Sequence, residues 1–492
     1  MPDTETKIDV LIVGAGPVGL FLANECARRG LRCRILETRA SQSEHSKALA
    51  IFPRTLEIFD MAGVVDGFLE KANRVTSVAI MTSGRTLADL RFEPENSPYS
   101  FVAMVPQDVT ETLLVDELRR KGGVVEYETT FVSADRRNEG VVVTADHKGD
   151  TIRVNASFVV GCDGARSNVR KALNLPLEGG EYPDEFLLAD VETNDSLPGN
   201  QLQLCPSEAG PVAIFPMSAT HRRIVATIDL PEGDAPSLEL VRKILKERGP
   251  GGVEPRSIGW SSYFRIHHRR AAELRKGRVF IAGDAAHLHS PFGGQGMNTG
   301  LQDVWNLAWK LDLYLRGHGN DELLDSYAAE RLPVIRQVID TTDFLTKALG
   351  TPNKLAQILR NAVIPMVSGL APVQHAFVER LSELGIAYRG SPIVEGPGRR
   401  YFEDSMRGGK GIGSRFLMLI DDDQEAAVRE AQKQLASFGD VVEIRQSPHK
   451  GVKLVRPDGY LAYQTDTGTI DSALTHVRRL LQRQTSQPAP VM

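Results

Sequence analysis

The chain has 492 residues, of which 41% are hydrophobic and 25% charged, and its formal net charge is −5. At roughly 100–200 residues per domain, this length predicts two to four domains. The weak negative charge argues against nucleic acid as a partner and gives no bulk attraction to anionic lipid. No stretch approaches the roughly 18–20 apolar residues that span a bilayer, so we expect no integral membrane segment and a protein that acts on small molecules.

The four cysteines, Cys26, Cys33, Cys162 and Cys205, show no CxxC spacing, and the first residues lack the basic and then apolar pattern of a signal peptide. Both observations predict a protein of the reducing cytoplasm. Peripheral attachment to a membrane stays open.

The amino-terminal end has the pattern of a strand, a glycine turn, a helix and a second strand. Residues 7–13 are a short apolar run, residues 17–29 carry apolar side chains at helical spacing, and residues 32–36 are again apolar. This order is typical of a βαβ unit in which the first turn binds phosphate.

The glycine turn carries the sequence Gly14-Ala-Gly16-Pro17-Val-Gly19, and Glu37 follows the second strand. Gly14 permits a tight turn, Gly16 lets a pyrophosphate approach the backbone, and Gly19 lets the helix pack on the strand. The helix that begins at Pro17 offers free N–H groups to phosphate, and Glu37 can accept from ribose hydroxyls. The pattern predicts a site for FAD or NAD without a 2′-phosphate, and a purely structural glycine turn is the alternative.

Two further motifs distinguish flavin from nicotinamide. Residues 159–170, VVGCDGARSNVR, form a strand that runs into a polar turn, and residues 283–303, GDAAHLHSPFGGQGMNTGLQD, follow a strand at 278–282. Together with the amino-terminal motif, they resemble those of the FAD-dependent aromatic hydroxylases, the group A flavoprotein monooxygenases related to p-hydroxybenzoate hydroxylase and the phenol hydroxylases. The resemblance covers essentially the whole chain and is closest to the bacterial members that oxidise phenols and aromatic polyketides.

The resemblance implies a set of cofactor contacts. Asp284 would accept from the ribityl hydroxyls of FAD, Gln107 would lie near the same chain, and Asp163 would close the floor of the flavin site. Lys47 stands where the family usually has arginine, so its role is open. The predicted cofactor-binding residues are Gly14, Gly16, Pro17, Gly19, Glu37, Lys47, Gln107, Asp163, Gly283, Asp284, Pro291, Gly294, Gly296, Met297 and Asn298.

The glycine-rich loop at residues 293–296 is expected to lie flat against the flavin ring, because glycines remove side chains from the contact. A helix is expected to begin at Thr299, since Thr299 and Gln302 fit a capping box. Its amino terminus would direct a positive dipole end at the flavin pyrimidine. A ligand-free surface loop and a metal site at His287 and His289 are the alternatives, but no further ligand residues accompany these histidines, so no metal is predicted.

The fold class is predicted to be α/β, with an insertion in the nucleotide domain. Residues 1–74, 105–182 and 271–390 would form a Rossmann-like FAD-binding domain with a helical extension. Residues 75–104 and 183–270 would form an inserted antiparallel sheet that covers the substrate cavity.

The last part of the chain, residues 391–492, resembles the thioredoxin-like carboxy-terminal domain of the phenol-hydroxylase branch. It contains no cysteine, so thiol redox chemistry is excluded there. Its expected elements are a strand at 415–421, a helix at 423–438, a strand at 440–444, a hairpin at 452–463 and a helix at 472–482.

The substrate pocket is predicted only in part. In residues 257–268, alternation places Ile258, Trp260, Phe264 and Ile266 on one face and Tyr263, Arg265 and His267 on the other. This polar trio and Pro291 of the flavin loop are the pocket candidates for positioning a phenol, and a solvated outer sheet face is the alternative for the trio. No residue is identified as the catalytic base.

By resemblance the protein is an NAD(P)H:O2 monooxygenase: NADPH or NADH reduces FAD, O2 adds to the ring, and the flavin hydroperoxide hydroxylates an aromatic substrate. The expected partners are a small aromatic substrate and O2, and the chain would be a monomer or a homodimer. A flavin-dependent halogenase is disfavoured because no WxWxIP-type segment is present. A flavoprotein that binds an aromatic ligand without turnover is the remaining alternative.

Overall fold

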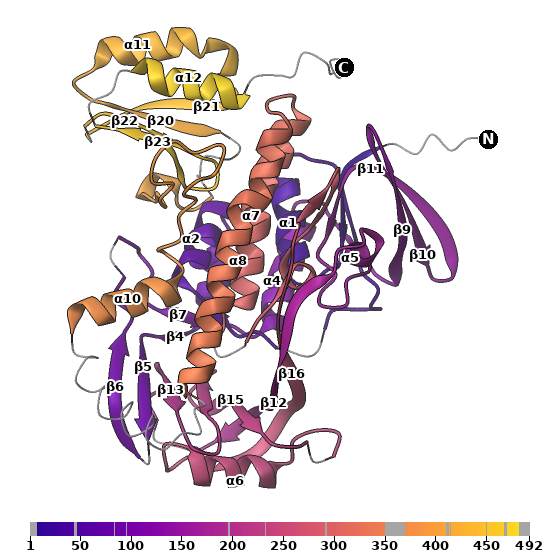
Figure 1. Cartoon of the computed structure of the whole chain (residues 1–492), viewed down its shortest axis with the longest axis vertical. Coiled ribbons are helices and arrows are strands. Elements are labelled where there is room, and N and C mark those ends of the chain that lie inside the picture. Colours follow the sequence, from indigo (N-terminus) through magenta and orange to yellow (C-terminus); the bar gives the residue numbers. More distant parts are fainter. Residues whose placement is uncertain are drawn as a thin grey trace.

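The protein is seen here in a computed structural model. It describes residues 7–43, 47–82, 84–94, 96–194, 197–231, 233–290, 293–349, 370–409, 413, 415–448, 450–466 and 470–481, without the side chains of 182–184, 266–267, 345–349, 371 and 373. Three bodies follow one another along the longest axis (Figure 1). The central body contains the dinucleotide motif, a large sheet lies at one end, and a small α/β unit from the end of the chain lies at the other.

The central body is built on an eight-stranded sheet with the order β17-β18-β11-β1-β2-β8, to which β9 and β10 are joined through β11. From β18 to β8 all neighbours are parallel. The strands are β1 (Ile8–Val13), β2 (Cys33–Leu36), β8 (Val125–Glu126), β9 (Thr129–Arg137), β10 (Gly140–His147), β11 (Asp150–Gly161), β17 (Arg275–Lys276) and β18 (Val279–Ile281). Because β1 is buried from Val10 to Val13, it reads as a continuous apolar run.

Helices cover this sheet and carry the motifs. Helix α1 packs against both α4 and α7, and α7 also packs against α8. The helices of the central body are α1 (Pro17–Arg28), α2 (Pro53–Ala62), α3 (Val65–Lys71), α4 (Gln107–Arg120), α5 (Asn168–Ala172), α7 (Gly296–Leu315), α8 (Asp321–Leu349) and α10 (Ala371–Ser382). A small sheet of β3 (Ala50–Ile51), β7 (Val102–Met104) and β4 (Asn73–Val75) lies beside them.

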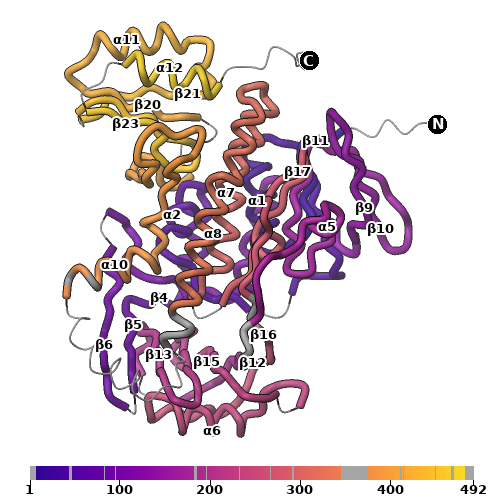
Figure 2. The backbone as a smooth tube through the Cα atoms, viewed as in Figure 1, coloured from indigo at the N-terminus to yellow at the C-terminus, as the bar shows by residue number. Residues whose placement is uncertain are grey.

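A second eight-stranded sheet forms the body at one end, in the order β19-β16-β12-β15-β14-β13-β5-β6. Its strands are β5 (Ser77–Thr82), β6 (Arg85–Arg91), β12 (Leu177–Thr193), β13 (Gln201–Cys205), β14 (Val212–Pro216), β15 (His221–Ile228), β16 (Pro255–Ala271) and β19 (His287–Leu288). The long strands β12 and β16 run side by side from the central body into this sheet (Figure 2). The sheet is mixed and not purely antiparallel as expected, because β13 pairs with β5 in parallel.

Strand β16 corrects the predicted facing of Ile258. A register shift opposite Asp190 and Val191 places an extra residue between Ile258 and Trp260. Such a bulge reverses the alternation of side chains. Ile258 therefore packs with Tyr263 in the apolar cluster that includes α6 (Leu238–Arg248), whereas Trp260 and Phe264 join the cluster on the other face of the sheet.

The carboxy-terminal unit has a four-stranded sheet in the order β21-β20-β22-β23. Its elements follow the expected order and are β20 (Phe416–Asp421), α11 (Glu425–Gln434), β21 (Val442–Ser447), β22 (Val452–Val455), β23 (Leu461–Thr465) and α12 (Ile470–Leu481). Its apolar core includes Trp309 and Leu313 of α7 and Leu323 of α8. The unit is therefore packed directly on the central body.

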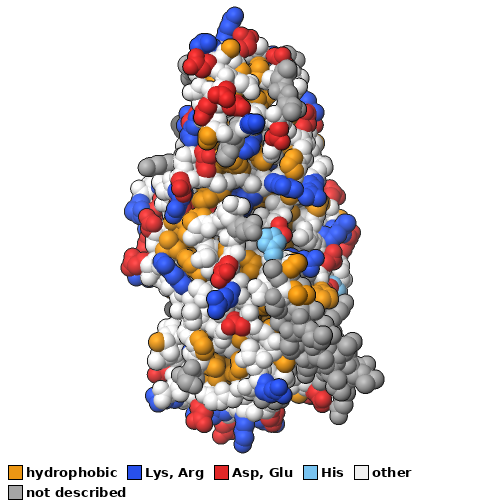
Figure 3. Space-filling view, turned by 90° about the vertical axis from the view of Figure 1, so that its left-hand side faces the viewer, with side chains coloured by type: hydrophobic (Ala, Val, Ile, Leu, Met, Phe, Trp, Pro, Cys, Tyr) orange, Lys and Arg blue, Asp and Glu red, His pale blue; other side chains and the backbone are white. Residues whose placement is uncertain are grey.

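The surface carries charges of both signs. On the face in Figure 3, Lys and Arg side chains alternate with Asp and Glu and form no extended patch of one sign. Within the described residues, no helix is both long and apolar enough to cross a membrane. All four cysteines are free thiols.

Candidate flavin and substrate site

The first glycine turn leaves open space where a phosphate would approach. A Cβ on Gly14, whose φ is +101°, would lie 2.5 Å from the Cys162 carbonyl oxygen, and one on Gly19 would lie 1.9 Å from that of Gly14. A Cβ on Gly16 would meet nothing within 4 Å. Helix α1 begins at Pro17 with no side-chain cap, so its first N–H groups are directed at this space. Packing within the protein requires glycine at Gly14 and Gly19, whereas the protein itself leaves room for a side chain at Gly16.

Glu37 holds the same turn from the end of β2. Its carboxylate accepts from the Ala15 backbone N–H at 2.8 Å and from Arg39, whose backbone N lies at 2.9 Å and Nε at 3.1 Å. Burial alone would raise the pKa of Glu37, but the hydrogen bonds from Arg39 and Ala15 lower it, so the side chain is a carboxylate. This places a fixed negative charge beside the turn.

The Gly283–Asp284 turn lies at the end of β18. Gly283 has a φ of +59° and begins a single 3₁₀ turn. The Asp284 side chain is exposed to a cavity although protein surrounds it, and this burial raises the pKa of its carboxyl group. Asp284 therefore presents its carboxyl oxygens to the inside of the cavity.

The two histidines after this turn have protein partners. His287 Nε2 lies 2.8 Å from Asp303 Oδ2, and His289 Nδ1 lies 3.2 Å from the Ser290 carbonyl oxygen. Burial and the neighbouring His287 lower the pKa of His289 to about 4, so this ring is neutral at pH 7. Among the residues that the structure describes, no group of three His, Cys, Asp or Glu side chains could hold a metal ion.

Helix α7 begins at Gly296, three residues before the predicted start at Thr299. The predicted capping box therefore lies inside the first turns, and Gln295 at the N-cap position makes no side-chain cap. Asn298 ties this end to β3, because its Oδ1 accepts from Phe52 N at 2.9 Å and its Nδ2 donates to Ala50 O at 2.8 Å. The uncapped helix end faces the cavity beside Asp284.

One cavity of about 470 Å³ joins the motifs to the large sheet. On the nucleotide side it is lined by Gly16, Pro17, Lys47, Gln107, Asp284, Gly294, Gly296 and Met297. On the sheet side it is lined by Leu188, Phe215, Arg223, Val225, Trp260 and Phe264. A flat ring at the uncapped end of α7 would thus have an apolar wall opposite it.

Other predicted residues lie outside the cavity lining. Asp163 binds the amino terminus of α5, whose N-cap is Ser167, since its Oδ2 accepts from Asn168 N at 2.7 Å and Val169 N at 3.1 Å. Gly14, Gly19, Glu37, Gly283 and Asn298 shape the turns from behind and do not line the cavity.

Of the polar trio, Tyr263 packs on the far side of the sheet, and Arg265 reaches the rim of the cavity but is mostly exposed and pairs with Glu185. Tyr263 therefore lies away from the cavity, and Arg265 contributes only to its rim. The His267 side chain and Pro291 lie outside the described residues.

The positions of Lys47 and Gln107 are linked through the backbone of residues 47 and 48. Gln107 Oε1 accepts from Ala48 N at 3.1 Å, and Arg223 Nη1 donates to the Lys47 carbonyl oxygen at 2.9 Å. The Lys47 side chain is exposed and lines the cavity, as Asp284 does.

Arg223 is a cavity residue that the sequence analysis missed. It is 2% exposed, and both ends of its guanidinium donate to the Asp190 carboxylate at 2.7 Å. Its guanidinium lies 6.0 Å from the centre of the Trp260 ring. The available signal was a pair of arginines, Arg222 and Arg223, at the start of the mostly apolar strand 222–228, where a buried charge requires a partner.

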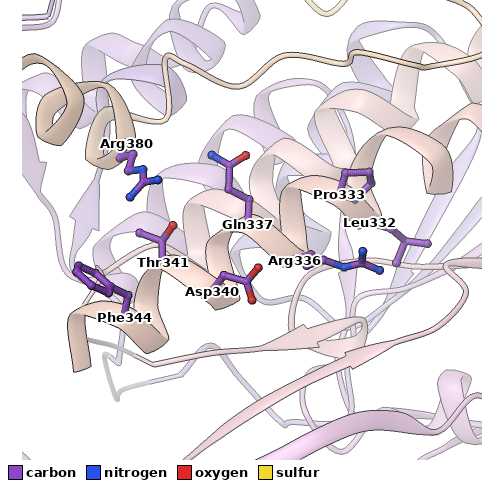
Figure 4. Close-up of a pocket in the computed structure, with 8 residues that line it drawn as sticks. All are labelled: Leu332, Pro333, Arg336, Gln337, Asp340, Thr341, Phe344 and Arg380. Atoms are coloured by element: carbon purple, nitrogen blue, oxygen red, sulfur yellow. The ribbon is translucent and has the colours of Figure 1, made fainter. Parts of the chain in front are cut away.

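A second cavity, of about 560 Å³, is a groove between α8 and α10 (Figure 4). Pro333, Arg336 and Asp340 line it from α8 and Arg380 from α10. It is larger than the first cavity, but it contains none of the motif residues and its polar side chains are exposed. We therefore place the candidate site in the 470 Å³ cavity.

Fold and site together point to a flavoprotein, since the uncapped ends of α1 and α7 and a glycine loop line one cavity that has an apolar wall opposite them. Residues 7–342 match the model of the "FAD binding domain" family. The chain belongs to this family, that of the FAD-dependent aromatic hydroxylases, and it is a flavin-dependent monooxygenase. Its cofactor is FAD, and NAD(P)H is the reductant typical of the family.

Characterised relatives match along nearly the whole chain. The 6-methylpretetramide 4-monooxygenase of Streptomyces rimosus is 32% identical over 521 residues, which cover 94% of this chain and 91% of the relative. A rifampicin monooxygenase of Streptomyces venezuelae is 30% identical, with 92% of this chain and 95% of the relative covered. The solved structure of the anhydrotetracycline hydroxylase OxyS of Streptomyces rimosus superposes with a TM-score of 0.80 at 29% identity, over 97% of this chain and 99% of the other.

Proposed function

We propose that this monooxygenase hydroxylates a polycyclic phenol of the aromatic-polyketide type. The observation that supports it most directly is the cavity wall opposite the flavin side, which combines Leu188, Phe215, Trp260 and Phe264. Such a wall offers stacking area to fused rings and few hydrogen bonds to a small polar phenol. Relatives named for tetracycline-type compounds and for rifampicin fit the same proposal.

The proposed cofactor contacts are those that line or shape the cavity. Gly16 and the amino terminus of α1 would bind the pyrophosphate, Glu37 the ribose, and Asp284 the ribityl chain. Gly294, Gly296 and Met297 would lie against the ring. Bound FAD supplies the transfer of electrons from NAD(P)H and the activation of O2.

The chain's own contribution would be electrostatic and steric. The uncapped amino terminus of α7 would direct a partial positive charge toward a flavin bound in the cavity and so stabilise the negative charge that the ring gains on reduction. The apolar wall excludes water and orients the aromatic ring. The Arg223–Asp190 pair would fix residues 47–48 and the edge of Trp260, and so the width of the cavity.

The proposed domain division keeps the predicted boundaries, with residues 391–492 as a thioredoxin-like unit. Two observations support it: the four-stranded sheet of this unit forms no ladder with the other described sheets, and β12 and β16 connect the central body to the large sheet.

The test is a comparison of substrate classes. A tetracyclic phenol such as anhydrotetracycline should stimulate NAD(P)H oxidation by the FAD-loaded protein and give a product one oxygen heavier by mass spectrometry. Pentachlorophenol is the monocyclic comparison. Oxygenation of the monocyclic phenol alone would contradict the substrate class, and binding of either compound without any oxygenated product over many turnovers would favour the non-catalytic alternative.

A further inference from the structure

The Gly283–Asp284 turn is held from behind by one buried carboxylate. Asp303 Oδ2 in α7 accepts from Gly283 N at 3.1 Å and from His287 Nε2 at 2.8 Å. Both ends of the segment that presents Asp284 to the cavity are thus fixed to the same oxygen atom. Asp303 itself is fully buried and does not line the cavity.

Arg331 in α8 holds the other oxygen of that carboxylate. Its Nε donates to Asp303 Oδ1 at 2.7 Å, and its Nη2 donates to the Thr299 carbonyl oxygen in the first turn of α7 at 3.1 Å. Burial alone would raise the pKa of Asp303, but Arg331 and His287 lower it, so Asp303 remains charged. The pair therefore fixes the Gly283 turn and the flavin end of α7 at once.

Tyr388 connects Arg331 to the carboxy-terminal unit. The phenol oxygen of Tyr388 accepts from Arg331 Nη1 at 3.2 Å. The Tyr388 ring centre lies 4.4 Å from that of Tyr460, and the Arg456 guanidinium lies 4.9 Å from the Tyr388 ring centre. Arg456 and Tyr460 belong to the turn between β22 and β23, residues 456–460, which we call the C-terminal turn.

The C-terminal turn is itself anchored to α8 by charge. Arg456 donates to both oxygens of Glu330, at 2.6 and 2.8 Å, and to Asp458 at 2.6 Å. Glu330 precedes Arg331 in α8, so one of two neighbouring residues contacts the C-terminal turn and the other contacts Asp303, which holds the Gly283 turn. Each of these ionic side chains is at most 2% exposed, and the loss of one partner would leave an unpaired buried charge.

We propose that the carboxy-terminal unit is a positioning part of the flavin site. The C-terminal turn holds Tyr388 and α8, and Arg331 and Asp303 then hold the Gly283–Asp284 turn in the geometry that binds FAD. Asp303, Arg331, Tyr388 and Arg456 are positioning residues, because none of them lines the cavity. The proposal does not depend on which aromatic compound is hydroxylated.

The central experiment uses Tyr388→Phe, which keeps the ring and removes the acceptor of Arg331. Tyr401→Phe is the matched control, since its hydroxyl donates to Glu403 in the same part of the chain and does not contact Arg331. The dissociation constant of FAD is measured by fluorescence, and amide exchange of residues 283–288 is measured in the apoprotein. Tyr388→Phe should weaken FAD binding about fivefold, within the range for coupling through packed networks, and raise exchange at 283–288. Tyr401→Phe should leave both unchanged.

The conservative variant Arg456→Lys tests the C-terminal turn. Like Tyr388→Phe, it should weaken FAD binding and raise amide exchange at residues 283–288. If Tyr388→Phe and Arg456→Lys lower the melting temperature but leave both the FAD constant and the exchange of residues 283–288 at wild-type values, the unit has only a structural role and the proposal is wrong. If Arg456→Lys does not fold, Tyr388→Phe decides alone.

A double-mutant cycle tests whether the effect passes through Asp303. The double variant Tyr388→Phe/Asp303→Asn should raise the FAD dissociation constant by much less than the product of the two single fold-changes. The reason is that Asp303→Asn already breaks the connection from Arg331 to the Gly283 turn. The control combines Tyr388→Phe with Asp312→Asn, a buried aspartate of the same helix that pairs with Arg316. In this control pair the two effects on the free energy of FAD binding should add. If they added in both pairs, the proposed coupling through Asp303 would be wrong.

Discussion

The two walls of the cavity are built in different ways. The nucleotide side is made largely of backbone: Gly16, Gly294 and Gly296 line it at the uncapped ends of α1 and α7. The sheet side is made of side chains, above all Trp260 and Phe264. The backbone turns can be recognised in the sequence, because their conformation requires glycine. The sheet wall cannot be recognised in the same way, because the strand register decides which face of the sheet each side chain occupies. The first wall is therefore suited to a constant cofactor and the second to a variable substrate.

The largest expected effect is the loss of FAD binding when a glycine on the nucleotide side, the backbone wall, is replaced. Gly19→Ala would place a Cβ 1.9 Å from the Gly14 carbonyl oxygen, so the turn must open and FAD retention should be lost. Gly16→Ala, which meets no protein atom within 4 Å, should fold with an unchanged melting temperature and still bind FAD weakly. The visible flavin spectrum and the melting temperature of the purified proteins measure both effects. Gly199→Ala, also in open space, is the control.

Asp284→Ala should be the next largest effect. Loss of a charge-assisted hydrogen bond to the ribityl chain should weaken FAD binding about 10- to 100-fold, as titration of the apoprotein with FAD would measure. Asp325→Ala removes an exposed aspartate that pairs with Arg275 and should change nothing. An unchanged FAD constant for Asp284→Ala would remove Asp284 from the cofactor site.

Substitutions in the sheet wall should weaken substrate binding and leave FAD binding unchanged. Trp260→Ala removes an aromatic side chain from the cavity and should raise the KM for a polycyclic phenol about 10- to 100-fold, because roughly 1.5–3 kcal/mol of burial is lost. The FAD constant should stay within about twofold. Ile258→Ala is the control on the opposite face of the same strand. If Ile258→Ala raised KM and Trp260→Ala did not, the bulge would be wrongly placed.

The smallest expected effect is a pH dependence of stability at Glu383. Burial raises the pKa of this carboxyl group to about 8, although Arg331 opposes the shift. Between the pKa of an unfolded glutamate and about 8, only the folded chain keeps this proton, so this group makes the free energy of unfolding fall with rising pH. Between pH 6 and pH 7 the free energy of unfolding should fall by about 1.4 kcal/mol more in the wild type than in the Glu383→Gln variant.

Denaturant titration at the two pH values measures that difference. Parallel pH profiles for the wild type and Glu383→Gln would show that Glu383 is ionised in the folded protein.

The sequence predicted the backbone wall well for a physical reason. Gly14-Ala-Gly16-Pro17 follows a strand and begins a helix, and only glycine tolerates the φ of +101° at Gly14. The start of α7 was placed too late, because Thr299 fits a capping box but Gly296 and Met297 already adopt helical geometry.

The sheet wall was predicted poorly because alternation is a local rule. The bulge before Trp260 forms in the pairing with β12, some seventy residues earlier in the chain. Its one local signal is the inserted residue Gly259, because an isolated glycine inside a strand pattern indicates a bulge, and the alternation rule ignored it. Asp303, Arg331 and Tyr388 were missed for a similar reason, since each is an ordinary helix or loop residue until the tertiary fold brings the three together.

The parallel pair of β5 and β13 has a consequence for synthesis on the ribosome. Ser77 and Gln201, which meet across this pair, are separated by 124 residues. The hairpin of β5 and β6 is therefore synthesised long before its neighbouring strand β13. Until β13 has been made, the edge of β5 stays unpaired. Closing the large sheet is a late, long-range event, and we expect it to limit the folding rate of the whole chain.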